Sequence, residues 1–232
     1  MKRIMTLFAL SLLFVGLLAS TVYAYTTKMS VTPSTFTVGK IGKIFKINVT
    51  VADVINLYGF EFKLEYNSTL LDAINITLGS FFPNPNSSFV LKNYINHTAG
   101  YLWFAATLLA PEPPKIGSGI LATITFNATY GTIYPDTAQC DLHLYDTILG
   151  DNTGQSITHD TVDGQYAFAP IRGDINGDGI VDIFDMVIVA TAFGSRLSDP
   201  SPPWDQRADL NNDSKIDILD AVILAVNFGT TG

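Results

Sequence analysis

The most constraining feature of the sequence is an acidic twelve-residue pattern that occurs twice near its C-terminal end. The copies read DINGDGIVDIFD from Asp174 and DLNNDSKIDILD from Asp209, so 209 − 174 places them 35 residues apart. In both, carboxylate or amide side chains stand at the first, third, fifth, ninth and twelfth positions. A hard cation that prefers six to eight oxygen ligands requires this spacing, because alternate residues of a tight loop point inward. Each copy is therefore predicted to be a calcium loop.

Two calcium ions are expected, one in each loop. The ligands of the first are predicted to be Asp174, Asn176, Asp178, the backbone carbonyl of Ile180, Asp182 and Asp185. Those of the second are predicted to be Asp209, Asn211, Asp213, the carbonyl of Lys215, Asp217 and Asp220. Four carboxylates in one loop repel one another unless a divalent ion neutralises them, so a solvated acidic turn is the weaker interpretation. Ser214 replaces the sixth-position glycine of the second loop, which is expected to bind somewhat more weakly.

The segments that follow the loops are predicted to be helical. DIFDMVIVATAFG and DILDAVILAVNFG are apolar up to Gly194 and Gly229, which are placed as C-terminal stops. The segments before the loops are broken by proline and glycine, so only the exiting half of an EF-hand is present. Two such half EF-hands, joined by a proline-rich link that contains Trp204, resemble a dockerin domain over residues 171–232.

This resemblance implies calcium-dependent folding and binding of a cohesin domain through either helix, with near two-fold symmetry. The recognition positions of the family fall here on Ile183, Phe184, Ala190, Thr191, Ile218, Leu219, Ala225 and Val226. One branch of the family carries a Ser/Thr pair at the tenth and eleventh loop positions, whereas this chain is apolar there. The surface of the partner is therefore expected to be apolar too.

Residues 25–168 alternate between apolar and polar side chains, as in KIFKINVTV, GFEFKLEY and LATITFNAT. This period of two predicts half-buried β-strands. Strands are expected near 28–31, 43–51, 59–66, 71–78, 88–94, 100–107, 121–129, 139–147 and 164–168. About nine short antiparallel strands favour an all-β, jelly-roll-like sandwich followed by the small α domain of residues 174–232, with 169–173 as linker.

One predicted strand, YLWFAATLL from Tyr101, is apolar on both faces. Either it is a central strand covered on both sides, or Tyr101 and Trp103 belong to a binding surface. The only cysteine, Cys140, shares one strand face with Leu142 and Leu144 and is therefore expected to be a small buried hydrophobe. With no second cysteine, no disulfide is expected.

The stretches VTPSTFTVGKIGKIFKINVTV, GFEFKLEYNSTLLDA, GSGILATITFNAT and VDGQYAF resemble the strand pattern of a cohesin over about residues 27–168. The resemblance implies that a dockerin docks on the strands around 59–66, 88–94, 100–107 and 139–147. That face would carry Glu61, Lys63, Tyr101, Trp103 and His143.

The N-terminus has a basic start, an apolar run and small residues ending at Ala24, which predicts a signal peptide over residues 1–24 and an extracellular protein. The run is short for a membrane anchor, and no membrane span is expected in the mature chain. Acceptor triplets of the form Asn-x-Ser/Thr predict glycosylation at Asn48, Asn67, Asn75, Asn86, Asn96 and Asn127, and a seventh lies at Asn212.

The net charge of −8 and the absence of a basic cluster argue against nucleic-acid binding. Three functions remain. The first is a non-catalytic adaptor whose partners are cohesin-bearing and dockerin-bearing proteins, as in assemblies that degrade polysaccharides. The second is a carbohydrate-binding sandwich that stacks sugars on Tyr94, Tyr101 and Trp103. A glycoside hydrolase is the least supported, because the sandwich has few carboxylates, neither a Gly-x-Ser-x-Gly nor a His-Glu-x-x-His motif, and no long loops for a cleft. Whether the dockerin recognises the cohesin of its own chain stays open.

Overall fold

The computed structural model describes residues 26–82, 86–132, 134, 136–199 and 201–232. The predicted signal peptide, residues 1–24, lies outside the described residues. In the part that is described, none of the helices has the length and apolar character needed to cross a membrane.

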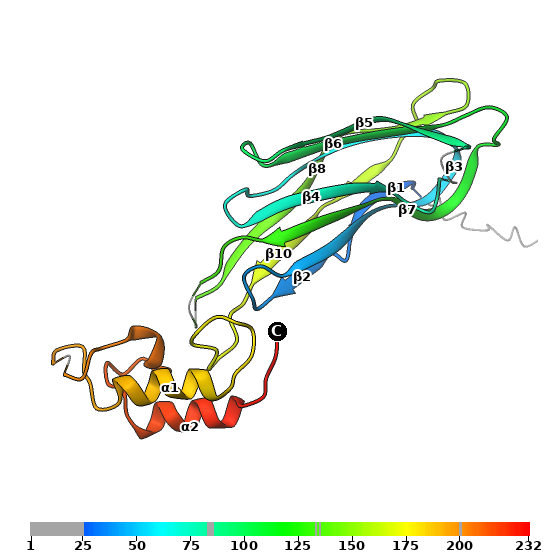
Figure 1. Cartoon of the computed structure of the whole chain (residues 1–232). Coiled ribbons are helices and arrows are strands. Elements are labelled where there is room, and N and C mark those ends of the chain that lie inside the picture. Colours follow the sequence, from blue (N-terminus) through cyan, green and yellow to red (C-terminus); the bar gives the residue numbers. More distant parts are fainter. Residues whose placement is uncertain (1–25, 83–85, 133, 135, 200) are drawn as a thin grey trace, which may run out of the picture.

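A two-layered sandwich of strands occupies the N-terminal part of the chain, and a small helical domain follows it (Figure 1). The strands are β1 (Lys28–Thr32), β2 (Thr35–Val38), β3 (Ile44–Glu65), β4 (Leu71–Leu78), β5 (Ser88–Asn96), β6 (Tyr101–Leu108), β7 (Lys115–Ala128), β8 (Ala138–Asp151), β9 (Asp160–Val162) and β10 (Gly164–Phe168). The helical domain contains α1 (Ile183–Ala192), a 3₁₀ turn η1 (Gln206–Ala208) and α2 (Ile218–Asn227).

The long strand β3 belongs to both layers. Its first half pairs antiparallel with β1 and β7, and its second half pairs with β6 and β8. Between the halves, Asp53 and Asn56 adopt left-handed φ angles of 55° and 68°, which short polar side chains tolerate best after glycine. One layer therefore has the order β4, β7, β3, β1, β9, and the other has β5, β6, β3, β8, β10, β2.

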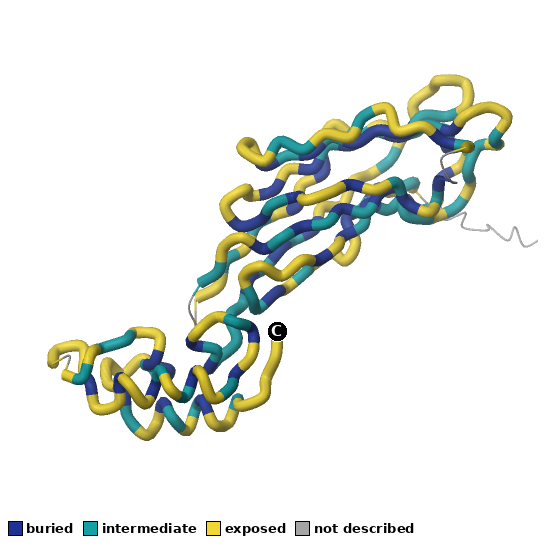
Figure 2. Tube along the Cα trace, viewed as in Figure 1, coloured by how far each residue is buried: buried dark blue, intermediate teal, exposed yellow. Residues whose placement is uncertain are grey.

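The core lies between the two layers and follows the predicted alternation. Phe45, Ile47 and Val49 of the first half of β3 are buried, and so are Phe62 and Leu64 of the second half. Figure 2 shows buried and exposed positions alternating along these strands. Burial of each such side chain contributes about 1.5–3 kcal/mol, so this core is a large source of stabilisation for the sandwich.

Two strands were not predicted from the sequence. β2 and β9 are four and three residues long and pair parallel with β10 and β1. Segments this short show too little alternation to be recognised. The two strands expected at 43–51 and 59–66 are instead halves of one continuous β3. With β2 and β9 added, the sandwich has ten strands among the described residues and not the nine expected.

The helical domain has a small core of its own. Its buried apolar residues are Ile175, Val181, Val189, Ala192, Ala208, Leu210, Ile216 and Leu224. Helices α1 and α2 lie side by side in Figure 1, and Trp204 of the link between them packs against this core partly buried.

Each acidic loop is tied to the segment that follows the helix of the other repeat. After α2, Gly229 N–H donates to the carbonyl of Val181 at 2.8 Å, and Val181 N–H donates to Thr230 at 3.0 Å. After α1, Gly194 N–H donates to the carbonyl of Ile216 at 2.8 Å. The loop of each repeat is therefore hydrogen-bonded to the segment that follows the helix of the other repeat, and we call these bonds the crosswise ties.

The two domains touch at the turn of residues 39–43, between β2 and β3. Lys43 Nζ donates to the backbone carbonyl of Gly232 at 3.4 Å. A Cβ atom on Gly39 would lie 3.0 Å from Cγ1 of Ile171, and one on Gly179 would lie 2.7 Å from Cδ of Lys40. The first acidic loop and the C-terminal tail therefore rest against one end of the sandwich.

Candidate functional site

The last residues of each acidic loop also start a helix. Asp182 is the N-cap of α1, and its carboxylate accepts the Phe184 N–H at 2.8 Å. Asp185, three residues later, accepts the Asp182 N–H at 2.8 Å and completes a capping box. Asp217 and Asp220 form the same box at α2. The ninth and twelfth loop positions therefore orient the helices as well as offering oxygen atoms to an ion.

The first position holds the rest of the loop in place. One carboxylate oxygen of Asp174 accepts N–H groups from Gly177 and Asp178 at 2.8 and 3.1 Å, and the other accepts from Gly179 at 2.9 Å. Asp185, which is completely buried, accepts the N–H groups of Ile175 and Asn176 from the start of the loop. Hydrogen bonds from backbone N–H groups to the Asp174 and Asp185 carboxylates therefore hold the fold of the loop.

Burial and charge repulsion oppose ionisation of Asp174 and Asp220 when no cation is present. Burial raises the pKa of Asp174, and repulsion by Asp185 and Asp178 raises it further. Burial also raises the pKa of Asp220, with repulsion by Asp209 in the same direction. A divalent cation would reverse both effects, because it replaces lost hydration and screens the repulsion.

The donor chemistry of both loops fits calcium, since each offers carboxylate, amide and backbone carbonyl oxygens and no sulfur or imidazole. Within the described residues, no three or more His, Cys, Asp and Glu side chains already stand together as a metal site. The calcium assignment therefore depends on donor type, spacing and the loop hydrogen bonds.

The sixth loop position explains why a glycine is expected there. Gly179 has a φ of 86° in the first loop, and Ser214 has a φ of 66° at the same position of the second. A residue with a Cβ pays roughly 1–2 kcal/mol to adopt this left-handed conformation. The second loop is therefore the more strained of the two.

The helices expose matching apolar strips. We define strip 1 as Ile183, Phe184 and Val187, which are 58, 65 and 55% exposed. We define strip 2 as Ile218, Leu219, Val222 and Val226, which are 63, 54, 50 and 80% exposed. The other predicted recognition residues, Ala190, Thr191 and Ala225, are exposed as well. Sequence reasoning missed Val187 and Val222, although each lies one helical turn after the first residue of its strip.

The outer face of the β5, β6, β3, β8 sheet gathers most of the predicted docking residues. Register pairs Tyr94 with Trp103, Trp103 with Lys63, and Lys63 with Tyr145, so one row of side chains crosses all four strands. Glu61 lies two residues from Lys63 on the same face. Tyr101 and Trp103 are half-buried by neighbouring side chains and face away from the second layer, which favours the binding-surface interpretation of this strand.

Cation–π contacts and hydrogen bonds organise this row, which we call the aromatic face (Glu61, Lys63, Lys92, Tyr94, Tyr101, Trp103 and Tyr145). Trp103 Nε1 donates to Glu61 Oε1 at 2.8 Å. The ammonium of Lys63 lies 5.1 Å from the centre of the Trp103 ring, and that of Lys92 lies 4.6 Å from it. Lys63 also pairs with Asp146 at 2.8 Å. Two cations therefore flank one indole.

His143 lies on β8 beside the aromatic face, and Asp163, just before β10, holds its ring. Its Nδ1 lies 2.7 Å from Asp163 Oδ2, and its ring stacks on Tyr145 with centroids 6.0 Å apart. The hydrogen bond to Asp163 raises the pKa of His143. Lys92 and Tyr145 were not predicted as docking residues. A bulge between Val90 and Lys92 interrupts the alternation that would have placed Lys92 on this face.

The predicted glycosylation sites differ in accessibility. Asn67, Asn75 and Asn86 are exposed, whereas Asn48, Asn96 and Asn127 are half-buried. The Thr123 hydroxyl donates to Asn48 Oδ1 at 2.8 Å, and Asn127 Oδ1 is buried. Cys140 is only partly buried, and this burial raises the pKa of its thiol.

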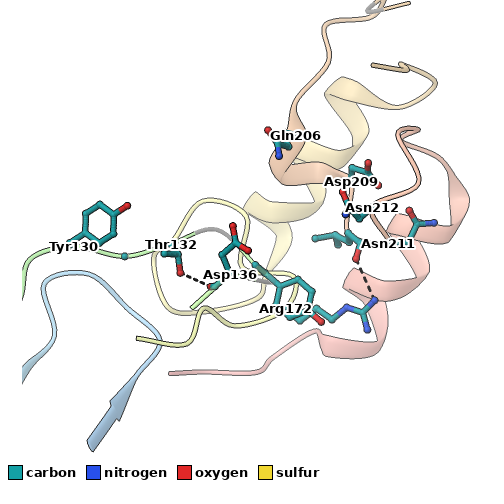
Figure 3. Close-up of a pocket in the computed structure, with 11 residues that line it drawn as sticks. Tyr130, Thr132, Asp136, Arg172, Gln206, Asp209, Asn211 and Asn212 are labelled. Carbon is teal, nitrogen blue, oxygen red and sulfur yellow. Dashed lines mark hydrogen bonds between the residues drawn. The ribbon is translucent and has the colours of Figure 1, made fainter. Parts of the chain in front are cut away.

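A polar hollow of about 570 Å³ lies between the sandwich and the second loop (Figure 3). Arg172 lies over the Tyr134 ring at 5.4 Å and donates to the backbone carbonyl of Leu210 at 3.3 Å. The carboxylates that line the hollow belong to Asp136 and Asp209. Asp209 is itself a predicted ligand of the second loop.

Comparison with known families separates the chain into two modules. The cohesin domain family matches residues 29–168, and the dockerin type I domain family matches residues 172–228. No curated protein matches the chain.

Solved structures resemble the sandwich. A non-cellulosomal cohesin from the hyperthermophilic archaeon Archaeoglobus fulgidus is 16% identical with a TM-score of 0.51, over 62% of this chain and 92% of that one. The type I cohesin–dockerin complex of OlpC and Doc435 from Clostridium thermocellum gives 15% identity and a TM-score of 0.53, over 63% and 95%. The OlpA and Doc918 complex from the same organism gives 15% and 0.52, over 62% and 99%. At these identities the likeness establishes the fold of the sandwich.

Proposed function

The chain belongs to the cohesin family and carries a type I dockerin domain after its cohesin domain, and from this premise we propose that it is a secreted, non-catalytic adaptor of polysaccharide-degrading complexes. A cohesin and a dockerin on one chain imply assembly through cohesin–dockerin pairing. In the proposed role, the aromatic face of the sandwich receives the dockerin of one protein, while strip 1 or strip 2 enters the cohesin of another.

The observation that carries this proposal is that one chain presents a receiving face and a donor surface at separate places. The aromatic face lies on the outer side of one sandwich layer. The strips lie on two helices of a different domain, whose first loop rests against the 39–43 turn. Two partners can therefore be engaged without competing for the same residues.

Calcium is the proposed cofactor of the donor surface. Type I dockerin domains characteristically bind calcium, and the residues that would hold it here are the twelve predicted ligands of the two loops. When bound, the ion would supply the positive charge that the loop carboxylates lack. Asp182 and Asp217 cap the helices that carry the strips, so ordering the loops would also orient the strips.

A catalytic role has little support. Both matched modules are non-catalytic, and no further module was matched. The junction hollow offers Asp136 and Asp209, but Asp209 is committed to the second loop as a proposed calcium ligand. Secretion is proposed because of the N-terminal sequence and the acceptor triplets, of which Asn67, Asn75 and Asn86 are the exposed ones in the sandwich.

Carbohydrate binding remains the second candidate, because Tyr94 is 41% exposed and its ring centre lies 6.0 Å from that of Tyr101. Sugars stack on open aromatic rings. The Trp103 ring is flanked by two ammonium groups and is only partly free for such stacking. Retention of the full chain on insoluble polysaccharide in the absence of any protein partner would favour this candidate over the adaptor.

The adaptor proposal is tested by capture from the native culture medium on the immobilised mature chain, with calcium and with chelator. The F184D/L219D double variant, one change in each strip, should lose cohesin-bearing proteins by at least tenfold and keep dockerin-bearing ones. The Trp103→Ala variant should show the reverse pattern. Ile44→Asp, at a 61% exposed position of the other layer, is the matched control. Recovery of neither class of partner by the unaltered chain would contradict the proposal.

A further inference from the structure

We infer that Lys92 prevents strip 1 or strip 2 of one copy of the chain from binding the aromatic face of another copy. The same lysine would favour a dockerin of another protein whose helices place a carboxylate opposite it. The inference rests on the proposed function, since it concerns the specificity of the same aromatic face. It assigns to the sandwich a partner of stated chemistry, which is a dockerin with a carboxylate on its docking helices and not a second copy of this chain.

The first observation is an uncompensated cation on the aromatic face. Lys92 is half-buried, with its ammonium 5.0 Å from the Tyr94 ring centre and 4.6 Å from that of Trp103. None of the carboxylates in the described ranges lies within 4 Å of it, whereas Lys63 has Asp146 at 2.8 Å. Two aromatic rings hold Lys92 in place but leave its charge available to an incoming anion.

The second observation is that neither strip can supply this anion. The only ionisable residue of α1 is Asp185, and the only one of α2 is Asp220. Both carboxylates are completely buried and accept backbone N–H groups of their own loops. The outward atoms of both strips are therefore aliphatic or aromatic. The flanking Asp182 and Asp217 are committed to capping the helices.

Charge decides which partner is tolerated. Covering Lys92 with an apolar strip would remove its water without providing a counter-ion, and an ammonium buried in this way costs several kcal/mol. A carboxylate at the same place would offset that cost and add a charge-assisted hydrogen bond. Specificity of this kind comes as much from the penalty against the wrong partner as from attraction to the right one.

The junction between the domains makes the distinction matter for assembly. Ile171 packs against Gly39, and Gly232 accepts from Lys43, so the loop end of the dockerin rests on the sandwich. The linker of residues 169–173 reaches at most roughly 18 Å, so a strip is not expected to reach the aromatic face of its own molecule. Pairing between copies would be head to tail and would produce open chains. By disfavouring this self-association, Lys92 would leave the aromatic face and the strips free to bind other proteins.

The first test measures self-association of the full mature chain by sedimentation, in calcium, from micromolar to sub-millimolar concentration. The unaltered chain should remain a monomer. Lys92→Met keeps length and removes the charge, and it should strengthen self-association by at least tenfold in calcium and not in chelator. Lys28→Met, an exposed lysine of β1 on the other layer, is the matched control and should remain monomeric. Self-association of the unaltered chain, or a Lys92→Met variant that behaves like Lys28→Met, overturns the inference.

The second test uses the immobilised full chain as bait in native medium and identifies captured proteins by mass spectrometry. Lys92→Glu should lose the dockerin-bearing partner by at least tenfold, Lys28→Glu should keep it, and changing an exposed carboxylate of that partner to lysine should restore binding to Lys92→Glu. If the unaltered bait captures no dockerin-bearing protein, the part of the proposed function in which the sandwich receives a dockerin fails. If Lys92→Glu captures the same protein as well as the unaltered bait does, only the present inference fails.

Discussion

The sandwich and the dockerin domain of this chain are stabilised by opposite means. The sandwich buries large side chains such as Phe62, Phe104 and Phe126 between two layers. The dockerin buries a small cluster around Val181, Ile216 and Leu224 and carries two completely buried carboxylates, Asp185 and Asp220, at its centre. Domains as small as this dockerin rarely obtain enough stability from apolar burial alone. They usually depend on a bound metal, a disulfide or oligomerisation. From this difference we predict that the sandwich stays folded without an ion, whereas folding of the dockerin depends on calcium.

Removal of calcium should produce the largest difference in folding between the sandwich and the dockerin. With chelator, the full chain should lose the helical circular dichroism of α1 and α2 and keep the β signal of the sandwich. Calcium at a thousand times its Kd stabilises the bound domain by about 4 kcal/mol, so the lower of two thermal transitions should move and the upper one should not. A single transition that is insensitive to chelator would contradict this predicted difference between the two domains.

Core truncations should sharpen the same contrast. Phe62→Ala in the sandwich is expected to cost about 3–5 kcal/mol and Leu224→Ala in the dockerin about 2–5 kcal/mol. The sandwich should still fold, whereas the dockerin should fail to fold at low calcium and be rescued by excess calcium. Chemical denaturation with and without calcium measures both. Val226→Ala, at an 80% exposed position, is the matched control and should stay within about 0.5 kcal/mol of the unaltered chain.

The two acidic loops provide a smaller and more local comparison. Ser214→Gly should relieve the left-handed strain at the sixth position and stabilise the calcium-bound dockerin by about 0.5–1 kcal/mol. Gly179→Ser should destabilise it by more, because a Cβ there would also meet the side chain of Lys40. Calorimetric titration of calcium into each variant measures the effect. Equal and opposite changes in the two variants would argue against the contribution of Lys40.

The smallest expected effect concerns pH at the edge of the aromatic face. Because the folded pKa of His143 is raised by Asp163, the charged pair stabilises the sandwich fully below about pH 6.5, and this stability is lost as pH rises through the folded pKa. The pair is about half exposed, so the change is at most a few tenths of a kcal/mol. NMR titration should show the His143 midpoint above 6.5 and closer to 6.5 in Asp163→Asn. A midpoint below 6.5 in the unaltered chain would show that burial outweighs the hydrogen bond.

The sequence predicted those parts of the fold that have a strong period or a repeat. Alternation located the strands that bury Phe45 and Phe62, and the duplicated loop pattern located both helices. It did not predict β2 and β9, because three or four residues show too little alternation and their partners are distant in sequence. It also treated β3 as two strands, since the left-handed residues Asp53 and Asn56 interrupt the pattern where the strand changes layer.

The candidate docking face was predicted in part. Glu61, Lys63, Tyr101 and Trp103 occupy outward positions of regular strands, and the structure brings them together. Lys92 escaped prediction because the bulge beside it shifts the alternation by one residue. Asp146 adopts a positive φ of 47°, and no periodic pattern anticipates that its carboxylate reaches Lys63. Irregular backbone therefore supplies the charged groups that periodicity misses, Lys92 and Asp146.

The crosswise ties between the two dockerin repeats bear on how such a domain could have arisen. Val181 of the first loop bonds to Gly229 and Thr230 beyond the second helix, and Ile216 of the second loop bonds to Gly194 beyond the first. An isolated repeat would lack the protein partners of these backbone groups and would have to bond them to water or to another copy of itself. Tandem duplication of a repeat that once paired as a homodimer would convert that pairing into an intramolecular one and remove its dependence on concentration. In the present domain, the two repeats contact each other within one chain as two subunits of a homodimer would.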